Sequence, residues 1–297
     1  MTTAGSVTAV ARAKSGAMWP AHPSLVGTAL VLPALLLILG LFLLPFGRLL
    51  VLSVTDPHPS LDNYTQVIRD PTLWRIILAT VEIAAVSTMA ALALGYPLAA
   101  WLASLPRVAA RILIIIVLLP FWTSILVRIY AWMVLLGREG VVNNALITAH
   151  LTNQPLPLLY SRFSVVIGMV HFLLPFMVLS LYSTMIGIDR TFLEASRTMG
   201  ASAVQTFMRV YFPLSLPGVY AGCLLVFILG LGFYVTPALL GGPHDTTIAV
   251  YIQQQIEYLN WNQGTAMAAV LIALVVVLFV IYDRLLGFER LFSGLGA

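Results

Sequence analysis

Long apolar stretches separated by short polar segments dominate the chain, and their lengths are its first structural signal. A helix needs about 20 apolar residues to cross a bilayer core of about 30 Å. The stretches of suitable length are Leu25–Phe46, Ile76–Leu102, Ile112–Leu136, Phe163–Ile186, Pro217–Leu240 and Thr265–Tyr282. This pattern predicts an all-α, multi-pass membrane protein with six transmembrane helices. The membrane domain would cover residues 25–286, with tails at 1–24 and 287–297.

The composition excludes several other classes of protein. Of the 297 residues, 60% are hydrophobic and 9% are charged, whereas a soluble domain carries about 25% charged residues. An ordinary soluble enzyme, a disordered chain and a secreted disulfide scaffold are therefore ruled out. Cys223 is the single cysteine, so the chain cannot form an internal disulfide or a cysteine-rich metal site.

The distribution of basic residues predicts which ends face the cytoplasm. With the N-terminus inside, nine basic residues lie in inside segments: Arg12, Lys14, Arg107, Arg111, Arg190, Arg197, Arg209, Arg284 and Arg290. Five lie outside or at the outer end of the first span: Arg48, Arg69, Arg75, Arg138 and Arg162. Because basic residues favour cytoplasmic segments, both tails are predicted to be cytoplasmic.

The inside connection over residues 187–216 carries helix signals that an ordinary linker lacks. Thr191 with Glu194 has the spacing of a capping box, in which each side chain satisfies a backbone N–H at the start of a helix. Gly200 then stands where a helix ends in a left-handed residue, a conformation that glycine adopts without steric cost. The pattern predicts a short helix that ends at a sharp turn.

A second helix is predicted directly after that turn. Ser202 with Gln205 forms another capping-box spacing, and Pro213 is expected to stop the helix. One apolar face follows the helical period, at Val204, Phe207, Met208 and Tyr211. Such a helix pair can lie on lipid headgroups, or it can dock into a groove of a soluble partner.

The residues of this segment resemble the EAA motif of ABC importer permeases. The family pattern is Glu-Ala-Ala, three residues, Gly, nine residues, Ile, one residue, Leu, Pro. The corresponding residues here are Glu194, Ala195, Ser196, Gly200, Val210, Phe212 and Pro213. Ser196, Val210 and Phe212 depart conservatively from the pattern.

Most of residues 60–240 are similar to the spermidine/putrescine permease branch of that family. The matching stretches are Leu61–Thr65, Leu94–Pro97, Pro120–Thr123, Arg128–Tyr130, Leu173–Met177, Gly200–Ser202, Pro217–Gly218 and Ala221–Leu225. The resemblance implies a type I ABC importer permease fold in the inner membrane of a bacterial cell. It also implies a small cationic cargo, with a polyamine as the first candidate.

The resemblance further implies how the protein works and with which partners. The first short helix, around Leu193–Met199, would couple the permease to an ATPase subunit. The coupling residues carried over are Leu193, Glu194, Ala195, Ser196, Met199, Gly200 and Ala201. The implied partners are a second, homologous permease subunit, two cytoplasmic ATPase subunits and an extracytoplasmic binding protein, all acting at the lipid bilayer, with no role for nucleic acid.

The chain is not expected to be an enzyme or to bind a cofactor of its own. Its sole lysine, Lys14, has Thr8 where the first glycine of a phosphate-binding loop should stand. ATP and Mg²⁺ would therefore be bound by the partner ATPase subunits. The five histidines show no metal-ligand spacing, and His171 is expected to be a hydrogen-bonded structural residue rather than a ligand.

Two ionisable residues fall well inside the predicted spans. Glu82 and Arg128 lie at similar depth in the outer half of the membrane, each about 12 Å from the end of its helix. Charges at such depth usually pair or face water, so we expect the two to pair or to share the lining of a translocation pathway. A structural ion pair without cargo contact is the alternative.

Aromatic side chains are the other candidates for the pathway, because cations bind to aromatic faces. Those selected are Trp122, Tyr130 and Tyr234; packing in the core or against lipid is the alternative. Three further functions remain open at this point. They are an ABC permease for another small solute such as an amino acid derivative or an opine, an ion-coupled secondary transporter, and a structural membrane protein.

Overall fold

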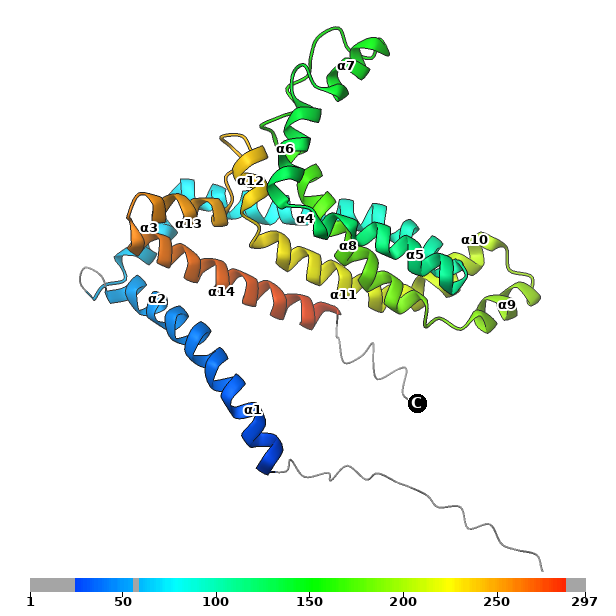
Figure 1. Cartoon of the computed structure of the whole chain (residues 1–297), viewed down its shortest axis with the longest axis horizontal. Helices are drawn as coiled ribbons and strands as arrows, with labels where there is room; N and C mark the ends of the chain where they lie inside the picture. Colours follow the sequence, from blue (N-terminus) through cyan, green and yellow to red (C-terminus); the bar gives the residue numbers. More distant parts are fainter. Residues whose placement is uncertain (1–24, 56–58, 287–297) are drawn as a thin grey trace, which may run out of the picture. The chain divides into compact units, whose positions relative to one another are not determined.

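The computed structural model describes residues 25–55 and 59–286, and within these ranges every regular element is a helix (Figure 1). The all-α prediction is therefore confirmed for the described part of the chain. The predicted tails, 1–24 and 287–297, lie outside the described residues. The chain divides into two compact units, Met1–Leu49 and Leu50–Ala297.

The described residues of the first unit form one long apolar helix, whose last residues belong to the second unit. Its parts are α1 (Leu25–Ile38), the π-helical η1 (Leu39–Leu43) and α2 (Leu44–Thr55). From Val31 to Val51 the large apolar side chains of this helix are exposed. Such exposure of Leu and Phe is the state expected of a helix that faces lipid.

The second unit contains all the remaining elements. In chain order they are α3 (Asp62–Arg69), α4 (Pro71–Ser104), α5 (Arg107–Leu118), the 3₁₀-helical η2 (Leu119–Trp122), α6 (Ile125–Leu136), α7 (Val141–Thr148), α8 (Arg162–Met185), α9 (Arg190–Thr198), α10 (Ala203–Thr206), the π-helical η3 (Phe207–Tyr211), α11 (Phe212–Leu231), α12 (Val235–Leu240), α13 (Ile248–Glu257) and α14 (Trp261–Leu286).

Five described helices are long and apolar enough to cross a membrane. They are Val31–Thr55, Pro71–Ser104, Arg162–Met185, Ala203–Leu231 and Trp261–Arg284. A sixth span exists if Arg107–Trp122 and Ile125–Thr148 are counted together. The predicted number of six is thus reached with one broken helix.

The third predicted span, Ile112–Leu136, is wrong as a continuous helix. The helices before and after Trp122 meet at 91°. Pro120 lies in the first turn of η2, and Thr123 is extended (φ −89°, ψ 143°). Because a proline supplies no backbone N–H and restricts the residue before it, the ladder of hydrogen bonds breaks here and the chain turns.

The fifth predicted span, Pro217–Leu240, is displaced along the chain. The observed helix begins at Ala203 and ends at Leu231, followed by Gly232. The residues to Leu240 form the separate helix α12. Apolar composition alone does not show where a helix breaks, because a buried loop segment and a short helix can be equally apolar.

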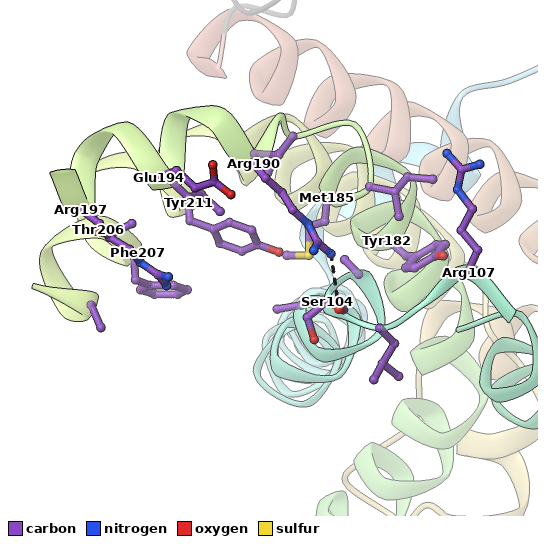
Figure 2. A pocket seen from close by; sticks show the side chains of 17 residues that line it. Ser104, Arg107, Tyr182, Met185, Arg190, Glu194, Arg197, Thr206, Phe207 and Tyr211 are labelled. Atoms are coloured by element: carbon purple, nitrogen blue, oxygen red, sulfur yellow. Dashed lines mark hydrogen bonds between the residues drawn. The ribbon is translucent and has the colours of Figure 1, made fainter. Parts of the chain in front are cut away.

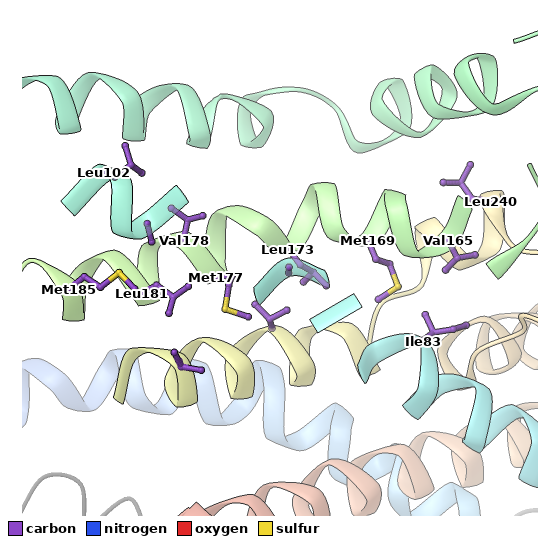
Figure 3. Close-up of a cluster of buried hydrophobic side chains, with 14 of the residues drawn as sticks. Ile83, Leu102, Val165, Met169, Leu173, Met177, Val178, Leu181, Met185 and Leu240 are labelled. Carbon is purple, nitrogen blue, oxygen red and sulfur yellow. The ribbon is translucent and has the colours of Figure 1, made fainter. Parts of the chain in front are cut away.

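The main core surrounds α8, which packs against α4 on one side and α11 on another (Figure 3). Its innermost side chains are fully buried, among them Met169, Leu173, Met177 and Leu181. On α11, a Cβ added to Gly218 would lie 2.7 Å from Thr184 Oγ1, and one added to Gly222 would lie 2.8 Å from Met177 Sδ. Small residues four apart therefore bring two helices close together, as membrane helices require.

A second apolar cluster joins α3, α4, α13 and α14. Its buried members are Val67, Leu73, Ile76, Ile77, Ile248 and Met267. A hydrogen bond supports the same junction, because the backbone N–H of Ile248 donates to Thr80 Oγ1 at 2.8 Å. This cluster holds α3, α13 and α14 against the part of α4 that carries Glu82.

Candidate functional site

The short helix α9 begins with an Asp cap, not with the predicted capping box of Thr191 and Glu194. Asp189 Oδ1 accepts hydrogen bonds from the backbone N–H of Thr191 at 2.9 Å and from its hydroxyl at 2.6 Å. Asp189 stands in front of the helix and takes the capping position first, so Thr191 already lies inside it. These bonds stabilise the charged carboxylate and lower the pKa of Asp189.

The end of α9 is the turn that the sequence predicts. Gly200 has φ +86°, the left-handed region in which glycine alone avoids strain. Its N–H donates to Arg197 O at 2.9 Å, and the N–H of Ala201 donates to Ser196 O at 3.1 Å. This pair of bonds is a Schellman motif, which satisfies the last carbonyls of a helix.

The helix after this turn starts as predicted but does not end at Pro213. Ser202 and Gln205 form a reciprocal capping box, with hydrogen bonds of 2.9 and 3.3 Å. The helix then passes through the π-helical turn η3 and continues as α11 to Leu231. The proline is the second residue after the wider π turn, where the usual ladder of hydrogen bonds is already interrupted. The predicted stop at Pro213 is therefore wrong, and α9 is attached directly to a spanning helix.

One polar contact fastens α9 to the base of that spanning helix. Ser196 is buried, and its hydroxyl forms a 2.9 Å hydrogen bond with Thr206 Oγ1. Ser196 also donates to Leu193 O at 2.8 Å. The serine that departs from the family motif is thus the residue that ties the two helices together.

The same helix pair also exposes large apolar side chains. Four of them are more than half exposed: Phe192, Met199, Val204 and Met208. We call these four residues the exposed apolar face. An apolar face held on two short, well-capped helices suits docking into a groove on another protein. Of the four, the coupling prediction includes only Met199.

Of the two roles expected for Glu82 and Arg128, the pairing is wrong, and a shared lining of the pathway stays a prediction. Glu82 instead forms an ion pair with Arg162, whose Nη1 lies 2.5 Å from Glu82 Oε1. Arg162 Nε also donates to Asp245 Oδ1 at 3.1 Å, while Asp245 Oδ2 accepts the N–H of Gly242 at 3.2 Å. We call Glu82, Arg162 and Asp245 the ionic cluster. It joins α4, the start of α8 and the segment between α12 and α13.

Arg128 instead binds backbone carbonyls at the break between η2 and α6. Its Nη2 donates to Pro120 O at 2.7 Å and to Thr123 O at 3.1 Å. Its guanidinium carbon lies 5.7 Å from the centre of the Phe172 ring, within cation–π range. Arg128 therefore satisfies the carbonyls that the bend exposes.

The neighbouring His171 is hydrogen-bonded, as expected from the sequence. Trp132 Nε1 donates to His171 Nδ1 at 3.0 Å. No group of three or more metal-ligating side chains exists among the described residues. His171 thus serves as an acceptor within the bundle.

Comparisons with known proteins agree with this arrangement of helices. The family model described as "Binding-protein-dependent transport system inner membrane component" matches residues 18–288. The chain belongs to this family. It is therefore a multi-pass permease subunit of the inner membrane, of the ABC importer type.

The permease is similar to several curated proteins. It is 37% identical over 228 residues to the spermidine/putrescine transport system permease protein PotB of Escherichia coli (strain K12), covering 76% of this chain and 82% of that protein. PotB of Haemophilus influenzae is 36% identical, with 76% and 79% covered. The inner membrane ABC transporter permease protein YdcU of Escherichia coli (strain K12) is 32% identical over 255 residues, with 81% and 80% covered.

Solved structures share the fold of the permease. One chain of a bacterial alginate ABC transporter, in complex with an alginate pentasaccharide-bound periplasmic protein, aligns with a TM-score of 0.74 at 18% identity. The alignment covers 87% of the permease and 93% of that chain. Because the identity is low, this likeness concerns the fold alone.

The structure brings only some of the predicted site residues together. Those of the coupling prediction lie on one helix and its terminal turn. The predicted lining residues are scattered over α4, η2, α6 and the segment before α12. Trp122, Tyr130 and Tyr234 are all exposed in the single chain, and their role in a pathway stays a prediction.

Sequence reasoning missed Arg162 and Asp245 as partners of Glu82. Arg162 was assigned only to the outside segments, and Asp245 was not singled out. A signal for them existed in the sequence, because Arg162 stands directly at the start of an apolar span and Asp245 follows the turn Gly241-Gly242-Pro243. A charge at the end of a span usually has a partner or contacts water, so Arg162 was a candidate partner for Glu82.

Proposed function

We propose that this permease imports a polyamine, spermidine or putrescine, driven by ATP hydrolysis on separate subunits. The cargo would arrive on an extracytoplasmic binding protein and cross between this chain and a homologous second permease subunit. ATP and Mg²⁺ belong to two cytoplasmic ATPase subunits, and this chain carries no catalytic residue or cofactor. Both of its termini lie in the cytoplasm.

The observation that carries the coupling role is the rigid attachment of α9 to a spanning helix. The Schellman turn at Gly200, the capping box of Ser202 and Gln205, and the Ser196–Thr206 hydrogen bond leave few free torsions between α9 and α11. A displacement of α9 by an ATPase would therefore be transmitted to the membrane part. The exposed apolar face supplies the surface on which the ATPase would bind.

The polyamine cargo is supported by the similarity to the PotB proteins, whose names state spermidine/putrescine transport. The ionic cluster adds a second argument. Its two carboxylates and single guanidinium carry a net charge of −1, and the Glu82 side chain is 56% exposed. An exposed carboxylate at the outer end of α4 favours the approach of a cation over that of an anion.

The decisive experiment is uptake of labelled spermidine and putrescine in cells that carry the whole transporter. Wild type should accumulate both, and the uptake should disappear when the ATPase subunit is inactivated. Dependence on an ion gradient instead of ATP would overturn the ABC mechanism. Uptake of an opine or an amino acid derivative, with no polyamine uptake, would overturn only the cargo.

Comparing Gly200→Ala with Gly200→Arg distinguishes the effect of backbone strain at the turn from the effect of a clash with a docked partner. A Cβ at position 200 meets nothing within 4 Å in this chain, so both variants carry the same backbone strain of about 1–2 kcal/mol. The arginine adds bulk only toward a partner. We expect Gly200→Arg to abolish uptake and Gly200→Ala to retain part of it, at matched membrane abundance. Equal uptake by the two variants would contradict docking at this turn.

A further inference from the structure

A half-open cavity of about 650 Å³ lies beneath α9, bordered by the end of α4, the end of α8, α9 itself and the start of the next spanning helix (Figure 2). Three arginines line it, Arg107, Arg190 and Arg197, together with one carboxylate, Glu194. The charged groups of the cavity therefore sum to +2. Its volume lies within the range of small-molecule sites.

The arginines of this cavity have no carboxylate partner among the described residues. In residues 25–55 and 59–286, the ion pairs are those of Arg162 with Glu82 and Asp245. Arg190 Nη2 donates to Ser104 O at a long 3.4 Å, as the dashed line in Figure 2 shows. Guanidinium groups that have no ion-pair partner can bind phosphate, because their N–H donors match its oxygens.

The wall of the cavity combines the charged groups with apolar side chains, and it lies at the end of the membrane-spanning segments. Leu105, Met185, Ile186 and Phe207 contribute apolar surface, and Tyr182 and Tyr211 add aromatic rings. Arg107 begins α5 only three residues after α4 ends at Ser104. In Figure 2 the labelled arginines are spread along the cavity, with Arg190 between the other two. A phosphate with an apolar attachment fits such a site better than a free ion does.

We propose that this cavity binds the phosphate-bearing headgroup of an anionic phospholipid such as phosphatidylglycerol. The arginines hold the phosphate, and the glycerol and first acyl carbons lie against Met185 and Ile186. Basic pockets between helices at a membrane surface recognise anionic headgroups in this way. Because Leu193 and Glu194 of α9 also line the cavity, a bound lipid would fill the space between α9 and the membrane helices. The binding itself does not depend on which cargo the permease carries.

The test is a lipid titration of the purified whole transporter in detergent, read by native mass spectrometry. Phosphatidylglycerol and phosphatidylcholine are the two probes. Arg107→Gln and Arg197→Gln change cavity residues on two different elements. Each should weaken retention of phosphatidylglycerol about tenfold, the loss expected for one charge-assisted hydrogen bond. Retention of phosphatidylcholine should be low and unchanged.

Two exposed arginines outside the cavity provide matched controls. Arg111 lies one turn from Arg107 on α5, and Arg209 lies on η3. Arg111→Gln and Arg209→Gln should leave phosphatidylglycerol retention unchanged. An equal loss in these controls would mean general surface attraction and would overturn the site. Equal retention of both lipids by wild type would overturn it as well.

Glycerol 3-phosphate and inorganic phosphate distinguish a lipid from a soluble phosphate compound. If either displaces phosphatidylglycerol at equal concentration, the site is one for soluble phosphates and the lipid assignment falls. If neither does, the apolar attachment contributes to binding, as proposed. Assembly with the other subunits, measured by size-exclusion chromatography, verifies that each variant is folded.

Discussion

Arginines lie at both ends of the α4–α8 pair, but among the described residues they are ion-paired only at one end. In the ionic cluster, Arg162 is held by Glu82 and Asp245. Beneath α9, the three arginines of the cavity lie beside one carboxylate, Glu194, without an ion pair to any described residue. A paired arginine between three elements is a structural device, whereas unpaired arginines around a cavity leave their donors free for a ligand. The environment of the residue, not its type, decides between the two roles.

Burial also differs within the ionic cluster. The Asp245 side chain is 9% exposed, while that of Glu82 is 56% exposed. A buried hydrogen-bonded charge is costly to unpair, and an exposed ion pair contributes little. Asp245 should therefore hold Arg162 in place, and Glu82 should be dispensable for stability.

The largest expected effect comes from Asp245→Asn. The substitution keeps the shape of the side chain but removes the charge that accepts the hydrogen bond from Arg162. We expect a loss of about 1.5–3 kcal/mol in the free energy of unfolding, typical of a hydrogen bond to a charged group. Chemical denaturation of the purified permease in detergent measures it.

Glu82→Gln is the control for that substitution. Its pair with Arg162 is exposed, so the loss should stay at about 0–1 kcal/mol. If Glu82→Gln destabilises the protein as much as Asp245→Asn does, the distinction between the two partners fails.

A smaller loss in the free energy of unfolding is expected from Ser202→Ala, next to the turn after α9. The variant removes half of the capping box at the start of the helix that carries α10, η3 and α11. The expected loss is about 1 kcal/mol, and uptake should fall more than membrane abundance because the turn below α9 loosens. Ser183→Ala, whose hydroxyl donates only to Ser180 O within its own helix, should change neither quantity.

The smallest effect concerns acid pH and the cap of α9. The pKa of Asp189 is lowered from its ordinary value of 3.8 by the hydrogen bonds of Thr191. The contribution of the Asp189 cap to the stability of α9 is therefore complete above that value. It is lost as the pH falls through the lower pKa of the folded state. Amide hydrogen exchange in α9 should accelerate in that acid range. In Asp189→Asn the additional acceleration should be absent; its persistence would show that another group titrates.

Features set by residues close together in sequence were predictable, and contacts between distant helices were not. Gly200, the Ser202–Gln205 box and the hydrogen-bonded state of His171 were predicted correctly. The pairing of Glu82 with Arg128 failed, although both residues lie at a plausible depth. Depth along a helix is a one-dimensional quantity, and it does not say which neighbour a side chain faces.

The sequence by itself determined the apolar helices, the left-handed turn at Gly200 and the membership of the family. These features depend on composition, on a single backbone conformation or on residues at most a few positions apart. Only the tertiary structure decided that Arg162 joins Glu82 to Asp245, that the third span bends by 91°, and that arginines from α5 and α9 line one cavity. Those outcomes depend on helices distant in sequence coming into contact, and packing between surfaces selects such contacts after the local structure is fixed.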